Sequence, residues 1–150
     1  MLFTATFFKV TGETQWTGTI PSEIGLLTTS LKRLEIFNAN LDVGSGIPPD
    51  LYKLTKLTSL IISNCESLGG TLSTNIGKLS YLEMLDISNN QMTGIIPLNE
   101  LMTLLQQDLD AVKILEGNKF ELNVTSYYMT SPANDVNEEQ PFKGLLQLLN

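Results

Sequence analysis

The stretch LTSLIISNCESL, residues 57–68, sets leucine and isoleucine at intervals that recur along the whole chain. Its apolar pair Leu60/Ile62 is separated by one residue, and Leu57 precedes the pair by three positions. The same kind of pair returns at Phe8/Val10, Leu34/Ile36, Leu85/Ile87 and Val112/Ile114. The first members of successive pairs are 26, 26, 25 and 27 residues apart. Such even spacing indicates an internal repeat of five units.

The alternation within each pair predicts a short strand with both apolar side chains on one face. One unit cannot bury that face alone, whereas stacked units bury it against one another. The spacing therefore predicts parallel strands near 8–10, 34–36, 60–62, 85–87 and 112–114, wound as a right-handed solenoid. Within this scheme Leu60 is expected to face the core and Ser59 to lie on the surface.

The second half of each unit is also repeated. Four segments carry it: TGTIPSEIGLL (17–27), GSGIPPDLYKL (44–54), GGTLSTNIGKL (69–79) and TGIIPLNEL (93–101). The glycines permit a bend that β-branched residues resist, and the prolines fix φ and end hydrogen-bonded pairing. The fourth unit runs long, and a helix is predicted over 100–107.

Taken together, the L-x-x-L-x-L starts and the Gly-x-Ile-Pro segments resemble the plant-type leucine-rich repeat, over residues 8–122. The resemblance implies an α/β solenoid with a parallel concave β-sheet and 3₁₀ or helical turns on the convex side. It also implies a second short strand at each Gly-x-Ile-Pro segment. We expect the array to occupy residues 1–122, with a tail at 123–150.

The resemblance also implies an asparagine five residues after the first strand leucine, where its side chain satisfies backbone groups inside the turn. Asn90 fits this position, while Ala39 and Cys65 occupy it in their own units. In the fifth unit either Gly117 or Asn118 does so. Cys65 is interpreted as a buried structural thiol, because a catalytic cysteine needs a histidine partner and the sequence has none.

The composition excludes several classes of function. The 150 residues carry a formal net charge of −7, and their nine Lys and Arg are scattered, which argues against nucleic acid binding. The absence of histidine removes the commonest general base and metal ligand. No phosphate-binding loop or metal-ligand spacing is present, so we expect no enzyme, cofactor or metal. No apolar run approaches the ~20 residues of a membrane span.

The two ends of the chain lack the paired-cysteine caps that the resemblance implies for secreted members. The apolar start MLFTATFFKV is interpreted as part of the array rather than as a signal peptide. A helix near 141–149 is predicted to cap the other end, and a partner-binding helix or the start of further repeats are its alternatives. Self-association through uncapped ends is a second consequence. Asn123 begins an Asn-x-Thr sequon, a glycosylation site if the protein is secreted.

Candidate partner-binding residues lie between the strand leucines, where side chains point out of the concave face. They are Arg33, Glu35, Phe37, Ile61, Ser63, Asp86, Ser88 and Lys113. Phe37 and Ile61 offer apolar contact, and the charged residues are expected to form a polar rim. The alternative is that all of them are ordinary solvated strand residues.

Two hypotheses for function remain. In the first, suggested by the resemblance, the chain is a non-catalytic recognition module that binds a protein, a peptide or a glycan on its concave face. It would then belong to a larger receptor-like protein, with an extracellular or cell-surface location. In the second, the repeats form a structural scaffold that mediates protein–protein assembly.

Overall fold

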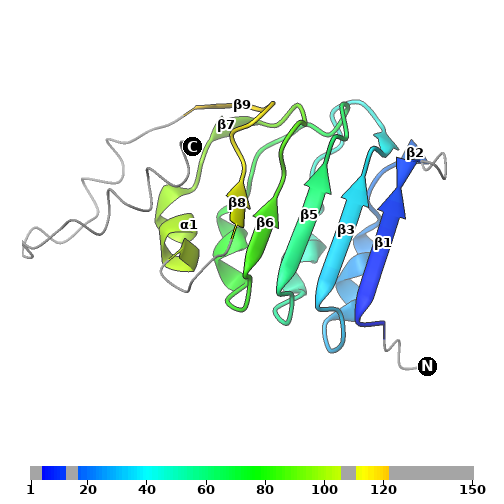
Figure 1. The fold of residues 1–150 in the computed structure, drawn as a ribbon, viewed down its shortest axis with the longest axis vertical. Coiled ribbons are helices and arrows are strands. Elements are labelled where there is room, and N and C mark those ends of the chain that lie inside the picture. The colour runs from blue at the N-terminus through cyan, green and yellow to red at the C-terminus, as the bar shows by residue number, and fades with distance from the viewer. Residues whose placement is uncertain (1–4, 13–16, 106–110, 122–150) are drawn as a thin grey trace, which may run out of the picture.

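The computed structural model describes residues 5–12, 17–105 and 111–121, and its largest element is a five-stranded parallel sheet (Figure 1). The strands follow one another in chain order. They are β1 (Phe7–Thr11), β3 (Arg33–Phe37), β5 (Ser59–Ser63), β6 (Met84–Asp86) and β8 (Ala111–Lys113). The register aligns the apolar pairs of all five units, so that Leu34 lies beside Leu60 and Leu60 beside Leu85. The predicted solenoid of five parallel units is confirmed.

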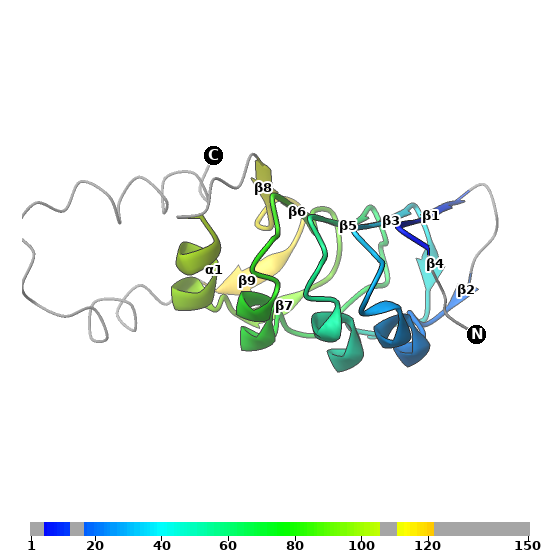
Figure 2. The same ribbon diagram turned by 90° about the horizontal axis from the view of Figure 1, so that it is seen from below.

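Short second strands and helical segments lie between the strands of the main sheet. Strand β2 (Thr17–Gly18) pairs with β4 (Asn40–Leu41), and β7 (Thr93–Ile95) pairs with β9 (Lys119–Glu121). The 3₁₀ turns are η2 (Ser22–Leu27), η3 (Pro49–Lys53) and η4 (Thr74–Lys78). Figure 2 shows the helical turns in one layer and the five-stranded sheet in the other. The predicted 3₁₀ turns are present, but the predicted second strands are confirmed at only two of the four Gly-x-Ile-Pro segments, 17–27 and 93–101. In the segment 69–79 only Thr71 pairs, as an isolated bridge to Thr93, and β4 lies before the segment 44–54.

The bends between these segments depend on glycine. Gly18, Gly70 and Gly94 have φ values of 100°, 75° and 84°, in the left-handed region that L side chains rarely adopt. Gly18 and Gly94 lie in the second strands β2 and β7, and Gly70 lies between β5 and η4. The proposed role of these three glycines is confirmed.

The core lies between the two layers and consists of the repeated apolar positions. Leu57, Leu60 and Ile62 are completely buried, as are their equivalents in the second and fourth units. Helical residues such as Leu51 and Ile76 close the core from the other side. The facing of Leu60 is as predicted.

The fourth unit carries an α-helix, α1 (Leu98–Leu105), where a helix over 100–107 was predicted. The helix begins two residues early because Pro97 ends the preceding strand segment and its carbonyl accepts a hydrogen bond from the Leu101 N–H at 3.1 Å. Its buried face carries Leu98, Leu101, Met102 and Leu104. Positions 106–107 lie outside the described residues.

The predictions for the two ends of the chain fall only partly on described residues. Strand β1 begins at Phe7, so the described part of the apolar start belongs to the array as predicted. Three further predictions lie outside the described residues. They concern the tail at 123–150, the helix predicted near 141–149 and the sequon at Asn123.

Gly25 tests how closely the helical turns of neighbouring units approach. A Cβ at Gly25 would lie 2.7 Å from the backbone oxygen of Asp50 and 2.8 Å from its Cβ. Gly25→Ala should therefore push η2 away from η3 and lower the free energy of unfolding by about 2 kcal/mol, as in other overpacked sites. Urea denaturation followed by circular dichroism measures this change.

Gly46→Ala is the matched control. A Cβ at Gly46 would meet nothing closer than the Gly69 oxygen at 3.7 Å, an ordinary contact. We expect this variant to keep the stability of the parent protein. Equal losses in the two variants would contradict backbone-to-backbone packing of η2 on η3.

Candidate functional site

The candidate surface is the face of the five-stranded sheet that is turned away from the helical layer, called the sheet face below. The strand register places its side chains in rows that run across the units. The central row is Lys9, Glu35, Ile61, Asp86 and Lys113. A second row, Phe7, Arg33, Ser59 and Met84, runs along one side of it, and a third row, Thr11, Phe37 and Ser63, runs along the other. The sequence-predicted residues on β3, β5, β6 and β8 are thus brought together.

A cluster of two cations, two aromatic rings and one carboxylate occupies the first two strands of this face. Arg33 Nη2 lies 2.7 Å from Glu35 Oε1, and Lys9 Nζ lies 3.4 Å from Glu35 Oε2. The Arg33 guanidinium lies 5.3 Å from the centre of the Phe7 ring, and the Lys9 ammonium 5.4 Å from that of Phe37. Both distances fall within the range of cation–π attraction. The four outer side chains are therefore held in place by Glu35 and by one another.

Glu35 differs from the sequence prediction. We expected an exposed rim group, but only 4% of Glu35 is accessible, because Lys9 and Arg33 close over it. Its carboxylate orients the two cations and is not itself available to a partner. Arg33 and Lys9 remain about half exposed on their side chains, at 58% and 47%.

The serines of the sheet face are also less exposed than expected. Ser63 and Ser88 are buried, and the Ser88 N–H and hydroxyl both donate to Asp86 Oδ1, at 2.9 and 2.6 Å. Ser59 was expected at the surface, yet it is only 7% accessible between its register neighbours Arg33 and Met84. That expectation was wrong because taller side chains on adjacent strands cover short ones. The short side chains of the sheet face are therefore buried between longer side chains, which extend further toward solvent.

The inner turn next to this face is held by two asparagines. Asn90 accepts a hydrogen bond from the Cys65 N–H at 2.9 Å and donates to the carbonyls of Ile62 and Ile87 at 2.7 and 2.8 Å. Asn118 makes the equivalent three bonds, to the Met92 N–H and to the carbonyls of Ile87 and Ile114. Of the two residues left open by the sequence, Asn118 and not Gly117 therefore occupies the fifth position.

Cys65 takes the same position in the third unit and is fully buried, as predicted. Its thiol donates a weak hydrogen bond to the Ser63 carbonyl, with the sulfur and oxygen 3.5 Å apart. Burial raises the pKa of the Cys65 thiol, which disfavours the reactive thiolate. These properties support a structural role.

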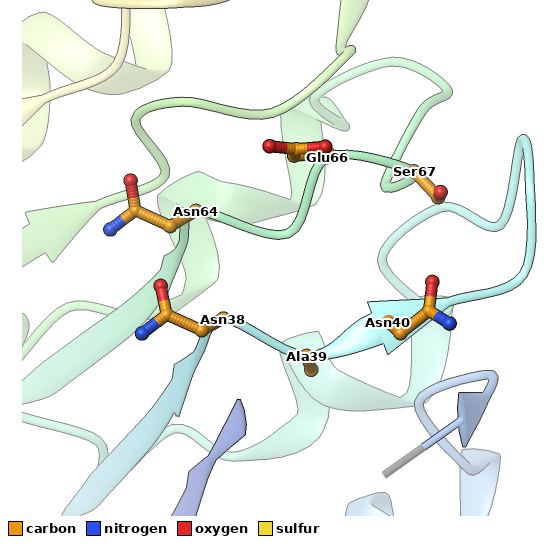
Figure 3. A pocket seen from close by; sticks show the side chains of 6 residues that line it. All are labelled: Asn38, Ala39, Asn40, Asn64, Glu66 and Ser67. Atoms are coloured by element: carbon orange, nitrogen blue, oxygen red, sulfur yellow. The ribbon is translucent and has the colours of Figure 1, made fainter. Parts of the chain in front are cut away.

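A second feature, a polar hollow beyond the ends of β3 and β5, was missed by the sequence analysis. Figure 3 shows its lining side chains, and its volume is about 410 Å³. The lining residues are Asn38, Ala39, Asn40, Asn64, Glu66 and Ser67. A sequence signal was present, because asparagine recurs two residues after the second member of the apolar pair in three consecutive units, at 38, 64 and 89.

Within residues 5–12, 17–105 and 111–121, no group of three or more Asp, Glu or Cys side chains is arranged to hold a metal ion. None of the helices there is both long enough and apolar enough to cross a bilayer.

Comparison with known proteins agrees with this fold. The model of the Leucine Rich Repeat family matches residues 81–99. A sequence search of curated proteins gave no match. The chain is a leucine-rich repeat protein of the plant type, as the repeat pattern, the parallel sheet and the solved structures described next all indicate.

Three solved structures illustrate the likeness. The ectodomain of the receptor kinase SOBIR1 from Arabidopsis thaliana is 30% identical, with a TM-score of 0.61 over 70% of this chain and 52% of that one. A plant ice-binding protein is 32% identical, with a TM-score of 0.55 over 71% of this chain and 31% of that one. The ectodomain of GASSHO1/SCHENGEN3 from Arabidopsis thaliana, solved with CASPARIAN STRIP INTEGRITY FACTOR 2, is 31% identical, with a TM-score of 0.56 over 71% of this chain and 12% of that one.

The chain spans about half the length of the first of these proteins and less of the other two. Two of these neighbours are receptor kinase ectodomains and the third is an ice-binding protein, so the fold by itself does not specify a ligand. The function of this chain must be argued from its own surface.

Proposed function

We propose that the chain is a non-catalytic recognition module whose sheet face binds an extended segment of a protein or peptide. The observation that carries the proposal is the arrangement of Phe37, Ile61 and Met84 on three adjacent strands, each partly accessible. They lie in three different rows of the sheet face, each two residues out of register with the next, so they form a diagonal apolar strip. Diagonal neighbours on adjacent strands are about 7–8 Å apart, which is within reach of aromatic and long side chains. Interfaces concentrate their energy in such central apolar anchors.

The surroundings of this strip favour binding because they are already ordered. Lys9 and Arg33 are fixed by Glu35 and by aromatic rings on one side. On the other side Asp86 is fixed by Ser88. Side chains that are ordered before binding lose little conformational entropy when a partner arrives, and this raises affinity.

The comparisons support a protein ligand over a scaffold role. GASSHO1/SCHENGEN3 was solved in complex with CASPARIAN STRIP INTEGRITY FACTOR 2. Two of the three neighbours described above are receptor ectodomains. By analogy, the proposal extends to an extracellular or cell-surface location within a larger receptor-like protein. A glycan on the sheet face is less favoured, because the strip offers few unpaired polar groups. Self-association of a scaffold array remains the alternative.

The proposal predicts that Phe37 is the main anchor, since it presents the largest apolar side chain of the strip. Peptides selected on the immobilised protein from a random displayed library serve as the probe. Phe37→Ala should weaken their binding about thirtyfold or more, the effect typical of an interface hot spot. Isothermal titration calorimetry measures the change.

Val43→Ala is the matched control, because Val43 is apolar and 92% exposed but lies in the loop after β4. It should leave the affinity unchanged. A truncation after residue 134 separates the tail from the sheet face. Loss of binding in the truncated protein, together with an unaffected Phe37→Ala variant, would assign the site to the tail and reject the sheet face.

A further inference from the structure

The polar hollow beyond the ends of β3 and β5 is separate from the apolar strip and has the size of a small-ligand site. Its volume of about 410 Å³ lies within the range of roughly 300–1,000 Å³ found for such sites. In Figure 3, Asn38 and Asn64 stand on one side, Asn40 and Ser67 on the other, and Glu66 between them. The hollow therefore collects polar side chains from two neighbouring units.

The backbone that carries these side chains is fixed in an unusual conformation. Asn38 and Asn64 have φ values of 53° and 56°, in the left-handed region. Hydrogen bonds between units hold them there, from the Asn38 N–H to the Ser63 carbonyl at 3.2 Å and from the Asn64 N–H to the Ser88 carbonyl at 3.1 Å. Because the two units are about 4.8 Å apart, both carboxamides can contact one small ligand.

The polar side chains of the hollow are not used by the protein itself. Within the described part of the chain, the side chains of Asn38, Asn40, Asn64, Glu66 and Ser67 make no hydrogen bond or ion pair. Four of the five are exposed and Ser67 is half-buried. Asn90 and Asn118 behave differently, since each uses its whole carboxamide on the backbone. The hollow thus offers solvent-accessible donors and acceptors that make no hydrogen bond within the described part of the protein, and two of them, Asn38 and Asn64, stand on backbone that is fixed.

The chemistry of this set restricts the ligand. Three carboxamides and a hydroxyl each donate and accept, and the carboxylate accepts. The lining contains no Lys or Arg to bind a phosphate, and no aromatic ring. Its only apolar residue, Ala39, is buried. The lining therefore disfavours an anionic ligand and favours a small one that is rich in groups able both to donate and to accept hydrogen bonds.

We propose that this hollow binds a neutral saccharide. Sugar hydroxyls donate and accept at once, so adjacent hydroxyls can pair with the carboxamides of Asn38 and Asn64 while another donates to Glu66. An acidic sugar would be repelled by the Glu66 carboxylate. A basic side chain of a partner protein is the competing ligand, because it would be attracted by the same carboxylate.

The test uses short neutral oligosaccharides of glucose, mannose, galactose, xylose and N-acetylglucosamine as probes, with oligogalacturonate and a lysine-rich peptide for comparison. They are titrated into the full chain labelled with nitrogen-15. At least one neutral oligosaccharide should shift the side-chain NH₂ resonances of Asn38, Asn40 and Asn64. Phe37→Ala should not alter this binding, so the result is independent of the proposed function of the sheet face.

The decisive variant is Asn38→Gly combined with Asn64→Gly, because glycine keeps the left-handed backbone and removes only the carboxamides. Losing two hydrogen bonds of about 1 kcal/mol each should weaken saccharide binding at least tenfold. Asn89→Gly is the matched control. Asn89 has the same conformation, with φ 54°, but lies outside the hollow, so its variant should bind normally.

Glu66→Gln separates the competing ligands. A neutral saccharide should lose only a few-fold in affinity, because glutamine still accepts a hydrogen bond, whereas a basic peptide should lose its binding. The proposal is overturned if none of the neutral probes shifts the asparagine resonances, if only oligogalacturonate does so, or if only the lysine-rich peptide binds and Glu66→Gln abolishes it. Equal binding by the double glycine variant and the parent protein would overturn it as well.

Discussion

Leu60→Asp is expected to unfold the array. Leu60 is completely inaccessible on the central strand β5, with Leu34 and Leu85 on either side in the register. Each unit can bury its apolar face only against its neighbours, so damage in the central unit affects the whole core. An unpaired buried charge costs several kcal/mol, which is comparable with the entire stability of a domain of this size. Far-ultraviolet circular dichroism and thermal melting should show loss of the folded state.

Tyr81→Asp provides the control for this variant, because it also replaces a large apolar residue by aspartate. Tyr81 is 59% exposed, and its ring forms a cation–π pair with the Lys56 ammonium at 5.1 Å. Losing that pair should cost about 1 kcal/mol or less. If both variants lowered the melting temperature equally, the assignment of Leu60 to the core would be wrong.

Asn90→Gly should have the second-largest effect, a loss of about 4 kcal/mol in the free energy of unfolding. The variant removes three buried hydrogen bonds. The Cys65 N–H and the Ile62 carbonyl lose their asparagine partner, whereas the Ile87 carbonyl keeps the hydrogen bond that Asn118 donates. Each buried backbone group that loses its partner costs about 1–3 kcal/mol, and partial access of water reduces the sum. Urea denaturation gives the value directly.

The neighbouring residue supplies the control, since Asn89→Gly makes the same chemical change one position away. Asn89 is exposed and left-handed, with φ 54°, a conformation that glycine adopts readily. We expect a change of less than about 1 kcal/mol. A similar loss at both positions would mean that glycine itself, and not the lost hydrogen bonds, causes the destabilisation.

The fold was predictable because it depends on spacing. The pairs Leu34/Ile36 and Leu60/Ile62 repeat with a period that only stacked parallel strands can satisfy, and each strand was placed to within one or two residues. The start of α1 was predicted less accurately. Hydrophobic periodicity alone does not show that Pro97 ends the preceding segment and lets the helix begin directly after it. The choice between Gly117 and Asn118 needed the backbone geometry of the fifth turn.

The surface was predictable only in outline. The alternation of residues along each strand correctly assigned Phe37, Ile61 and Asp86 to one face. It does not show how far the side chains on adjacent strands extend, and therefore which shorter side chains they cover. Glu35 and Ser59 were therefore placed at the surface, although Arg33 and its neighbours cover them. The asparagine hollow depends on left-handed φ values at the strand ends, which the sequence suggests only through the recurrence of asparagine. Whether either surface binds a partner stays a prediction.

Asn90 and Asn118 each make hydrogen bonds to the unit that precedes their own in the chain. Asn90 reaches back to Ile62 and Cys65 of the preceding unit, and Asn118 reaches back to Ile87 and Met92. A ribosome makes the chain from the N-terminus, so the third and fourth units emerge with these backbone groups still unpaired until the next unit follows. Each of these two units therefore becomes complete only when its successor has been synthesised, and the nascent chain should acquire its order one repeat behind the point of synthesis.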